Sequence, residues 1–484
     1  MAHTYLVVGL GVSGTSVVDM LTARGEHVLT ADDSKPADFT VAYINSSDFS
    51  FSSIDYVVTS PGFSPSTPFI ASAHAAHVPV MSDIELAWQT HQVQTSASSQ
   101  EDGQRWIGIT GTNGKTTTTE MTAAIMNASH EKAVAVGNIG NPITAAVVDT
   151  GVDTMVIELS SFQLHYTDSL ELDCAAITNL ADDHLDWHGG FDNYAHDKAK
   201  IYRRARRVVV YNADDQCVAR LAHDAQRTGE IGEQCQLVGF TLHSPSRGLI
   251  GVEDGWIINR SALSTRAEKV AQISSFVHLT EPDGTVYPHL LADALCALAL
   301  ALGAGVDEDV AIQALRDFAP SGHRIQTVAV LEGRHGEANI RFVDDSKATN
   351  AHAAAASLST YPEKSVVWIA GGLAKGAHFE ELVEAQAHVM KAAIIIGKDQ
   401  TLMREAFSAK APDVPLTFID PHSVSVDLPV MKQAVEAAGQ VADPGDVVLM
   451  APACASMDQF VSYADRGDQF AKYAIEWVNT HANK

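Results

Sequence analysis

The sequence predicts an α/β protein of three domains. Its 484 residues match a length of about three domains, and each could bury its own core. Short apolar runs alternate with helical patterns along the chain, and several of these runs end in glycine or polar residues. We expect domains at residues 1–97, 98–319 and 320–484, and the small polar stretch at 95–104 indicates a linker or exposed loop.

Composition excludes several classes of protein. The net charge of −27 argues against a nucleic-acid-binding surface, which needs clustered Lys and Arg. Five cysteines without a C-x-x-C pair indicate a reducing compartment. Residues 1–8 run into a strand with no basic signal region, and no apolar run approaches a membrane span. We therefore expect a soluble, cytoplasmic protein that is not inserted in a membrane, with a monomer as the default.

The first domain opens with a strand at 5–8, a glycine loop and a helix to residue 24. Gly9-Leu-Gly-Val-Ser-Gly14 matches G-x-G-x-x-G, and Asp32-Asp33 ends the next strand. A dinucleotide is the default ligand of such a loop. A nucleotide diphosphate such as a UDP-sugar suits it equally, because the glycines bind the diphosphate; a tight turn without a ligand is the third interpretation. Ser60-Pro61-Gly62 ends the strand 56–59 and could hold a second part of the ligand.

The second domain is organised around residues 107–117. An apolar strand at 106–109 precedes a loop with Gly111 and Gly114, and a helix follows at 116–126. Backbone N–H groups at such a junction bind phosphate, Lys115 would reach the β- and γ-phosphates, and the Thr116 hydroxyl would bind Mg²⁺. The match to G-x-x-x-x-G-K-[ST] is imperfect, since Ile109 occupies the first glycine position. A glycine-rich turn with an exposed lysine is the competing interpretation.

Polar residues follow further apolar strands of this domain. Glu158 ends the strand 154–157 and is placed for Mg²⁺. His184, with the nearby acids, could reach a metal, although each acid singly could be a loop or cap residue. A helix is predicted at 191–202, with Lys198 and Lys200 near its end. Either lysine could act as a point charge near a metal and phosphate site, or be a solvated lysine at the helix end. The acids near His184 are Asp182, Asp183 and Asp186.

The rest of the domain is less informative. Asp214 and Asp215 follow the strand 208–211 and either contact a nucleotide or turn the chain. Residues 216–285 are predicted to be strand-rich, and 288–302 form a long apolar helix whose polar exceptions are His289 and Asp293, one turn apart.

The third domain starts at a Pro-Ser-Gly hinge, residues 320–322, which we expect to close over bound ligands. Arg324 could then neutralise γ-phosphate charge. The strand from 341 ends in a dense polar run, 344–350, and the strands 366–370, 392–396 and 447–450 follow. Ser456 is predicted at a helix N-terminus, where it could bind a carboxylate. Cys454 lacks an obvious His partner and is predicted to be a buried packing residue.

These motifs resemble those of the Mur ligases, the ATP-dependent amino-acid ligases of peptidoglycan precursor synthesis, along the whole chain. The likeness is greatest to the members that add D-glutamate. The motifs that carry it are Gly9–Gly14, Thr110–Thr116, Gly137–Gly140, Glu158–Leu164, Asp183–Asp186, Gly322–Arg324, Asp344–Asn350 and Pro452–Phe460.

The resemblance implies an N-terminal Rossmann-like UDP-binding domain, a central P-loop-type ATPase domain and a C-terminal Rossmann-like α/β domain that binds the amino acid. ATP would phosphorylate UDP-MurNAc-L-alanine, and D-glutamate would attack the acyl phosphate. The implied cofactors are ATP, Mg²⁺ as one or two ions, and a carbamylated lysine, for which the motif favours Lys198 over Lys200.

The resemblance also assigns residues to each ligand. Catalysis is assigned to Lys115, His184, Lys198 and Arg324. Metal binding is assigned to Thr116, Glu158, His184 and Lys198. ATP binding is assigned to Gly111, Thr112, Asn113, Gly114, Lys115, Thr116, Thr117, Asp293, Arg324 and Asp345. The UDP-substrate is assigned to Gly11, Val12, Ser13, Asp32, Asp33, Ser60, Pro61, Gly62, Asn138 and Ser160. D-Glutamate is assigned to Lys347, Thr349, Lys375, Ser456, Met457 and Tyr463.

Three positions depart from the family pattern. Asp293 stands where the better-known enzymes carry Asn, Tyr463 stands where they carry Phe, and Asp32-Asp33 leaves open which acid meets the uracil. The competing functions are another ligase of the Mur or folylpolyglutamate type, an NAD-dependent oxidoreductase suggested by the first glycine loop alone, and a non-catalytic nucleotide switch.

Overall fold

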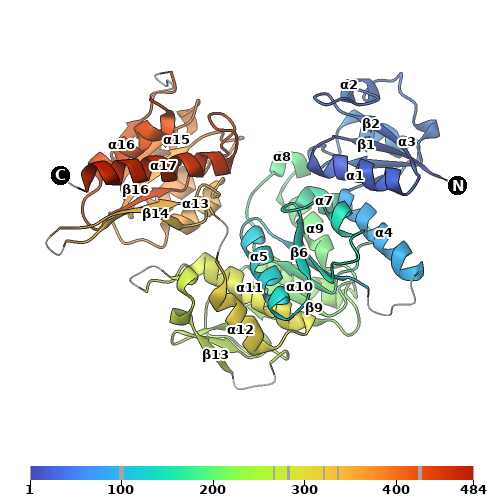
Figure 1. Cartoon of the computed structure of the whole chain (residues 1–484), viewed down its shortest axis with the longest axis horizontal. Helices are drawn as coiled ribbons and strands as arrows, with labels where there is room; N and C mark the ends of the chain where they lie inside the picture. Colours follow the sequence, from blue (N-terminus) through green and yellow to red (C-terminus); the bar gives the residue numbers. More distant parts are fainter. Residues whose placement is uncertain are drawn as a thin grey trace. The chain divides into compact units, whose positions relative to one another are not determined.

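The computed structural model confirms an α/β chain, with three separate sheets (Figure 1). It describes residues 2–97, 103–264, 268–280, 284–319, 322–334, 337–422 and 428–482. The chain divides into two compact units: residues 1–280 with 289–318, and 281–288 with 319–484. The predicted domain boundaries stay a prediction, and Pro320 and Ser321 of the predicted hinge lie outside the described residues.

The first sheet has four parallel strands in the order β2-β1-β3-β4. Apolar residues of β1 face both sides and are buried on both, as expected for a central parallel strand. The strands are β1 Thr4–Val8, β2 His27–Ala31, β3 Tyr56–Thr59 and β4 Val80–Met81. The helices are α1 Val12–Ala23, α2 Val41–Ile44, the 3₁₀ turn Phe51–Ser53 and α3 Pro68–Ala75.

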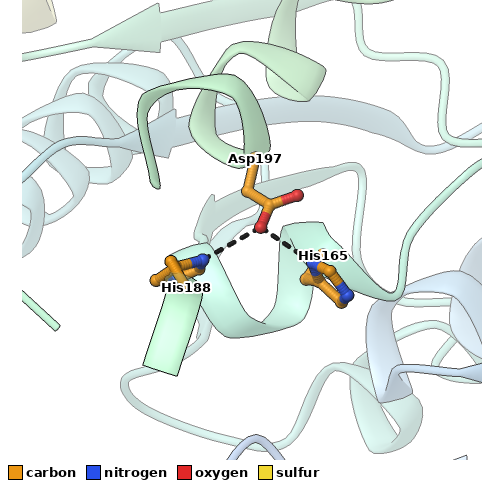
Figure 2. Close-up of side chains that lie close together, drawn as sticks. All are labelled: His165, His188 and Asp197. Atoms are coloured by element: carbon orange, nitrogen blue, oxygen red, sulfur yellow. Dashed lines mark hydrogen bonds and ion pairs between the residues drawn. The ribbon is translucent and has the colours of Figure 1, made fainter. Parts of the chain in front are cut away.

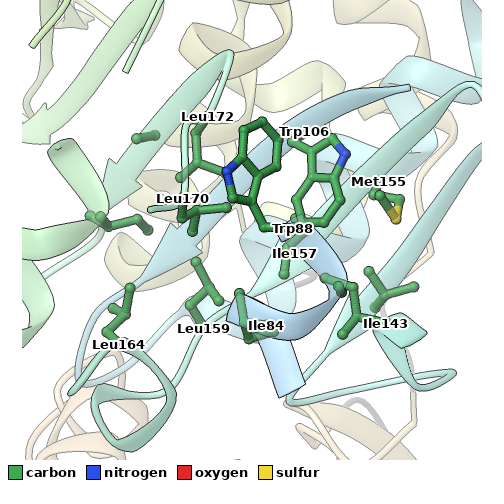
Figure 3. Packing of buried hydrophobic residues seen from close by; sticks show 14 of the residues in the cluster. Ile84, Trp88, Trp106, Ile143, Met155, Ile157, Leu159, Leu164, Leu170 and Leu172 are labelled. Atoms are coloured by element: carbon green, nitrogen blue, oxygen red, sulfur yellow. The ribbon is translucent and has the colours of Figure 1, made fainter. Parts of the chain in front are cut away.

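Helix α4, Asp83–Ala97, carries the chain from the first sheet to the second. Its Trp88 packs edge to face on Trp106 of β5, with ring centroids 5.1 Å apart, inside one apolar core that contains residues of both sheets (Figure 3). The prediction of a linker or exposed loop at 95–104 is wrong for 95–97, which are the last residues of α4. The small polar side chains of Thr95 and Ser96 suit a helix end, because their hydroxyls donate to the carbonyl oxygens one turn earlier, at 3.0 Å and 2.8 Å. Residues 98–102 of that linker lie outside the described residues.

The second sheet has the strand order β13-β12-β11-β10-β9-β8-β5-β7-β6. The strands from β6 to β11 are parallel, and β12 and β13 add antiparallel strands at one edge. The strands are β5 Arg105–Thr110, β6 Ala133–Gly137, β7 Thr154–Glu158, β8 Cys174–Ile177, β9 Val208–Asn212, β10 Gln236–Phe240, β11 Leu249–Glu253, β12 Trp256–Asn259 and β13 Lys269–Gln272.

The helices of this part are α5 Lys115–Ala128, α6 Ile143–Ala146, α7 Ser161–His165, α8 Leu185–His188, α9 Phe191–Ala199, α10 Gln216–Arg227, α11 Pro288–Ala304 and α12 Glu308–Asp317, with 3₁₀ turns at Lys200–Tyr202, Ile273–Ser275 and Val277–Leu279. The interpretation of 216–285 as strand-rich is wrong at its start, where α10 forms. Asp215 caps α10 by accepting from the N–H groups of Cys217 (2.9 Å) and Val218 (3.1 Å), so it performs a structural role.

The third sheet has the order β14-β15-β19-β16-β17-β18, parallel except for β14. Helices α13 to α15 contribute to the core on one face, and α16 and α17 to the core on the other. The strands are β14 Gln326–Leu331, β15 Ile340–Asp344, β16 Val366–Gly371, β17 Met390–Ile396, β18 Leu416–Phe418 and β19 Val447–Met450. The helices are α13 Ala351–Leu358, α14 Glu380–Gln386, α15 Thr401–Lys410, α16 Val430–Val441 and α17 Tyr463–His481.

The prediction that a helix begins at Ser456 is wrong. Residues 456–462 form turns, and the next helix, α17, begins at Tyr463. Side chains of this segment bind the loop after β17 instead: Gln459 accepts from the N–H of Gly397 at 2.7 Å, and Asp458 from that of Lys398 at 3.0 Å. Among the described residues, no helix combines the length and the apolar character that crossing a bilayer requires.

Candidate active site

The loop between β5 and α5 has a backbone that only glycine fits well. Gly114 has φ +79°, and a Cβ there would lie 2.1 Å from Oδ1 of Asp293. Gly111 has φ +152°, and a Cβ there would lie 1.9 Å from Oγ1 of Thr178. The absence of side chains leaves the loop amides accessible at the start of α5, as a phosphate requires. It also places the buried Asp293 of α11 directly against the loop.

Lys115 lies over its own loop. Its ammonium donates to the carbonyl oxygens of Gly111 (3.0 Å) and Thr112 (2.8 Å). The loop is fixed from outside, because the N–H of Asn113 donates to Asn179 at 2.9 Å and the hydroxyls of Thr112 and Tyr194 lie 2.8 Å apart. Thr117 is buried below the loop. A cation is thus held where phosphate charge would be bound.

Glu158, at the end of β7, is a buried carboxylate with two neutral partners. Thr116 Oγ1 donates to Oε2 at 2.7 Å, and Asn138 Nδ2 donates to Oε1 at 2.9 Å. The structure therefore joins three predicted site residues that lie far apart in the sequence. Their oxygens are hard donors of the kind that Mg²⁺ prefers, so the residues present fit a magnesium ion beside the phosphate loop.

Lys198 is the buried lysine of α9. Its ammonium donates to the carbonyl oxygen of Gly111 at 2.7 Å and to Thr110 Oγ1 at 3.2 Å, and it lies 4.9 Å from the ring centre of Tyr194. Burial, reinforced by the positive charge of Lys115, holds the pKa of Lys198 well below its usual range. Lys200 points elsewhere: its ammonium donates to the carbonyl oxygen of His165 at 2.8 Å.

His184 precedes α8 in a left-handed conformation with φ +53°. Its ring lies 4.7 Å from that of Phe162, and its Nε2 is 3.5 Å from a carboxylate oxygen of Asp183. Of the three acids predicted near it, Asp183 is the one that the structure pairs with His184, whereas Asp182 and Asp186 are exposed. Ser160 caps α7 in a reciprocal pair with Gln163.

The first glycine loop is held by Asp32. Its carboxylate accepts from the N–H of Leu10 at 2.6 Å and from Ser34 and Lys35 at 2.7 Å and 2.9 Å, and these backbone bonds hold its pKa below the usual range. Asp33 accepts from the N–H of Val41 at 2.8 Å. Both acids therefore stabilise local structure, and which one meets a uracil stays open.

Other predicted substrate residues surround this loop. A Cβ on Gly9 would lie 2.3 Å from Ser60 Oγ, so the loops that contain Gly11 and Ser60 approach closely. Val12, the first residue of α1, is 75% exposed. Ser13, Pro61 and Gly62 lie in the same two segments, at the ends of β1 and β3.

In the C-terminal unit, Asp345 is buried after β15. It accepts a hydrogen bond from Ser357, and burial raises its pKa to about 6 despite the nearby charge of Arg324. Asp344 beside it accepts from His323 Nδ1 at 2.7 Å.

The residues of this unit that are predicted to bind the amino acid belong to three loops, and these loops contact one another. Lys347 lies 5.6 Å from the ring centre of Tyr463, and Leu373 pairs with Ala455 as a β-bridge that joins the loops of Lys375 and Ser456. The predicted set also includes Thr349, whose N–H donates to the carbonyl of Lys347 at 2.9 Å, and Met457, which is 64% exposed.

Sequence reasoning missed two groups of polar residues. Arg466 of α17 is fully buried and donates to Ser346 Oγ (2.9 Å), Ser346 O (2.8 Å) and Cys454 O (3.0 Å); it thereby fixes two of the three loops. Cys454 is buried, as predicted, and burial raises the pKa of its thiol to about 12. The second group consists of His165, His188 and Asp197, whose side chains lie together (Figure 2). They come from three different helices, and no spacing in the sequence indicates that they meet.

A glycine loop that opens a helix, with a lysine, a threonine and a buried carboxylate around it, is typical of nucleotide-binding proteins that hold phosphate and magnesium. Family models match three segments: the Mur ligase MurD-like N-terminal domain at residues 3–82, the Mur ligase middle domain at 109–236 and the Mur ligase glutamate ligase domain at 323–454. The chain belongs to the Mur ligase family.

Relatives of full length support this membership. A protein of Bifidobacterium adolescentis named UDP-N-acetylmuramoylalanine–D-glutamate ligase is 56% identical, over 99% of this chain and 98% of its own. One of the same name from Streptomyces coelicolor is 40% identical, over 97% of each. Among solved structures, MurF of Acinetobacter baumannii (TM-score 0.58, 14% identity, 98% and 90% of the chains) and the UDP-N-acetylmuramate–alanine ligase of Thermotoga maritima (0.56, 17%, 99% and 100%) share the fold.

Proposed function

We propose that this protein is an ATP-dependent acid–D-amino-acid ligase of peptidoglycan precursor synthesis. It joins D-glutamate to UDP-N-acetylmuramoyl-L-alanine through an acyl phosphate and releases ADP and phosphate. The observation that carries the proposal is the set of bonds from Thr116 and Asn138 to Glu158 beside the phosphate loop. The full-length likeness to relatives named for this reaction supports the choice of substrates.

The reaction needs an activated carboxyl group. The carboxylate of the alanyl residue attacks the γ-phosphorus of ATP, ADP leaves, and the carboxyl carbon gains phosphate as a leaving group. The amine of D-glutamate then attacks that carbon, phosphate leaves, and the amine loses a proton. Because phosphoryl transfer depends chiefly on positioning and charge stabilisation, the residues of the site act mainly by holding and neutralising phosphates.

The residues around the second sheet, called the central sheet from here on, have distinct parts in this scheme. Lys115 exchanges its two loop carbonyls for phosphate oxygens, and the loop amides from Gly111 to Thr117 bind the rest. Thr116 and Glu158 would hold one Mg²⁺ ion, and His184 with the carbamylated form of Lys198 would hold a second. Bound Mg²⁺ supplies charge neutralisation at the phosphates.

Lys198 is proposed to carry a carbamate. Burial lowers the pKa of Lys198 and so favours its neutral amine, and a neutral amine adds CO₂ and loses one proton to give an anionic carbamate. This exchange would convert a buried cation into an oxygen ligand for Mg²⁺ and remove its repulsion with Lys115.

The remaining predicted residues are proposed to bind the substrates. The UDP-substrate contacts residues of the first glycine loop, the segment 60–62, Asn138 and Ser160. Asp293, Arg324 and Asp345 contact the nucleotide. D-Glutamate contacts Lys347, Thr349, Lys375, Ser456, Met457 and Tyr463. We also propose that the enzyme acts as a cytoplasmic monomer on these small molecules.

The test is ATP-dependent phosphate release with UDP-MurNAc-L-alanine and one amino acid at a time. Turnover is expected with D-glutamate and not with L-glutamate, L-lysine or meso-diaminopimelate. Turnover with another amino acid would reassign the C-terminal unit, and phosphate release without any amino acid would favour a nucleotide switch.

A further inference from the structure

A single buried carboxylate joins three helices of the central sheet. Oδ2 of Asp197 in α9 accepts hydrogen bonds from Nδ1 of His165 in α7 (2.7 Å) and Nδ1 of His188 in α8 (2.9 Å) (Figure 2). Its other oxygen, Oδ1, lies 3.0 Å from the ammonium of Lys200. All three bonds are charge-assisted. Asp197 and His188 are buried, so the bond between these two residues is shielded from water.

The bonds continue beyond the carboxylate. Nε2 of His188 lies 3.0 Å from Oγ of Ser161, the first residue of α7. Lys200 also donates to the carbonyl oxygen of His165, the last residue of α7, at 2.8 Å. Helix α7 is therefore held at both ends by groups that converge on Asp197.

Three of the connected residues lie close in the sequence to residues of the proposed site. Ser161 follows Ser160, and Asp197 precedes Lys198 in the sequence. His188 lies one helical turn after His184. Rotation or translation of any of these helices would move a proposed substrate or metal contact together with the network.

The side chains of His165, His188 and Asp197 suit a hydrogen-bonded network better than a metal site. The two imidazole Nδ1 atoms lie at hydrogen-bond distance from one oxygen, and the ammonium of Lys200 at 3.0 Å from the other would repel a cation. His188 also has a partner for its second nitrogen. The three groups thus form a satisfied network in which the carboxylate orients the imidazoles.

We propose that Asp197 is a positioning residue, which sets the placement of Ser160, His184 and Lys198 through His165, His188 and Lys200 and touches no substrate. The inference rests on the proposed function, because it explains how that site is kept in register. Groups that orient metal and phosphate ligands in this way are typically needed for activity although they never contact the reacting atoms.

The first experiment compares Asp197→Asn with the natural protein. The amide keeps the shape of the carboxylate but carries no charge. It can therefore present either an NH₂ group, which cannot accept, or a neutral oxygen, which accepts more weakly, to Nδ1 of His165 and Nδ1 of His188. We expect kcat to fall by about 10- to 100-fold and the apparent Mg²⁺ requirement to rise, while KM for the amino acid, which binds to the other unit, stays within about threefold. The matched control is Asp192→Asn, the same change at an exposed position of α9, which should leave kcat unchanged.

The natural protein is assayed first with D-glutamate, so that failure of the proposed function is seen separately from failure of this inference. Equal kcat values for the two asparagine variants would overturn the positioning role. Stoichiometric zinc in the natural protein that is lost in Asp197→Asn would also overturn it, in favour of a metal site.

A second variant keeps the test decisive if Asp197→Asn does not fold. In His188→Asn the amide nitrogen replaces Nδ1 and keeps the bond to Asp197, but it cannot reach Ser161. We expect His188→Asn to lose less kcat than His188→Ala. In the unliganded variants, hydrogen exchange should be accelerated, relative to the natural protein, more in α7 than in β5. Equal activity of His188→Ala and the natural protein would refute the network.

Discussion

Replacing Asp345 with asparagine should change how the stability of the C-terminal unit depends on pH. Asp345 is 7% exposed, and the burial of its carboxyl group raises the pKa from 3.8 to about 6. The folded protein therefore binds this proton more tightly than the unfolded chain does. The free energy of unfolding consequently falls as the pH rises from about 4 through about 6, because the buried group must then ionise.

The size of the effect follows from the shift in pKa. The difference between 3.8 and about 6, at 1.36 kcal/mol per pKa unit, corresponds to about 3 kcal/mol. About 2 kcal/mol of it is lost between roughly pH 4.5 and pH 7.5. Asparagine has no proton to lose, so Asp345→Asn should lack this loss and become more stable, relative to the natural protein, by about 2 kcal/mol over that interval.

The assay is native-state hydrogen exchange of peptides from β15 and α13 at several urea concentrations, which reports the stability of this unit separately. Intrinsic exchange rates are corrected for pH. Asp413→Asn, an exposed change in the same unit, is the control and should show no such difference. Parallel stability profiles for Asp345→Asn and the natural protein would refute the argument that burial of this carboxyl opposes its ionisation.

Three further predictions concern the central sheet. Lys198→Ala should lose most activity, and a short-chain carboxylate in the assay should restore part of it, since it supplies the missing anion; full activity without the additive would exclude the carbamate. Glu158→Gln should raise the Mg²⁺ concentration for half-maximal turnover and lower kcat by about 100-fold, whereas an unchanged Mg²⁺ titration would remove Glu158 from the metal site. Gly114→Ala should weaken ATP-analogue binding, measured by calorimetry, and cost at least about 1 kcal/mol of stability, because φ is +79° and Asp293 lies 2.1 Å from the new Cβ; wild-type affinity would show that the loop tolerates a side chain.

The sequence alone was enough to predict buried strands and the polar residues at their ends. The strands at 56–59 and 447–450 have the predicted bounds, since continuous apolar runs suit buried parallel strands. Glu158 was predicted at a strand end, and the structure adds its bonds to Thr116 and Asn138.

Features that depend on contacts between distant segments were missed. One local feature was missed as well: α10 forms at the start of 216–285, and Asp215, which the sequence analysis interprets as a nucleotide contact or a turn, is its N-cap. A helix was expected at Ser456, where the chain instead forms turns held by bonds from Gln459 and Asp458 to the loop after β17. The Asp197 network unites residues of three helices, and no spacing in the sequence encodes that convergence.

The apolar core that surrounds Trp88 and Trp106 belongs to two sheets at once. A cut after residue 97 would therefore leave tryptophan, leucine and isoleucine side chains of both pieces in water, and neither piece could replace the lost burial. The segment that holds the first glycine loop and the segment that holds the phosphate loop must then melt in one cooperative transition. Inhibitors that occupy either loop should protect both from proteolysis, which makes resistance to cleavage a simple readout for compounds bound at either of the two loops.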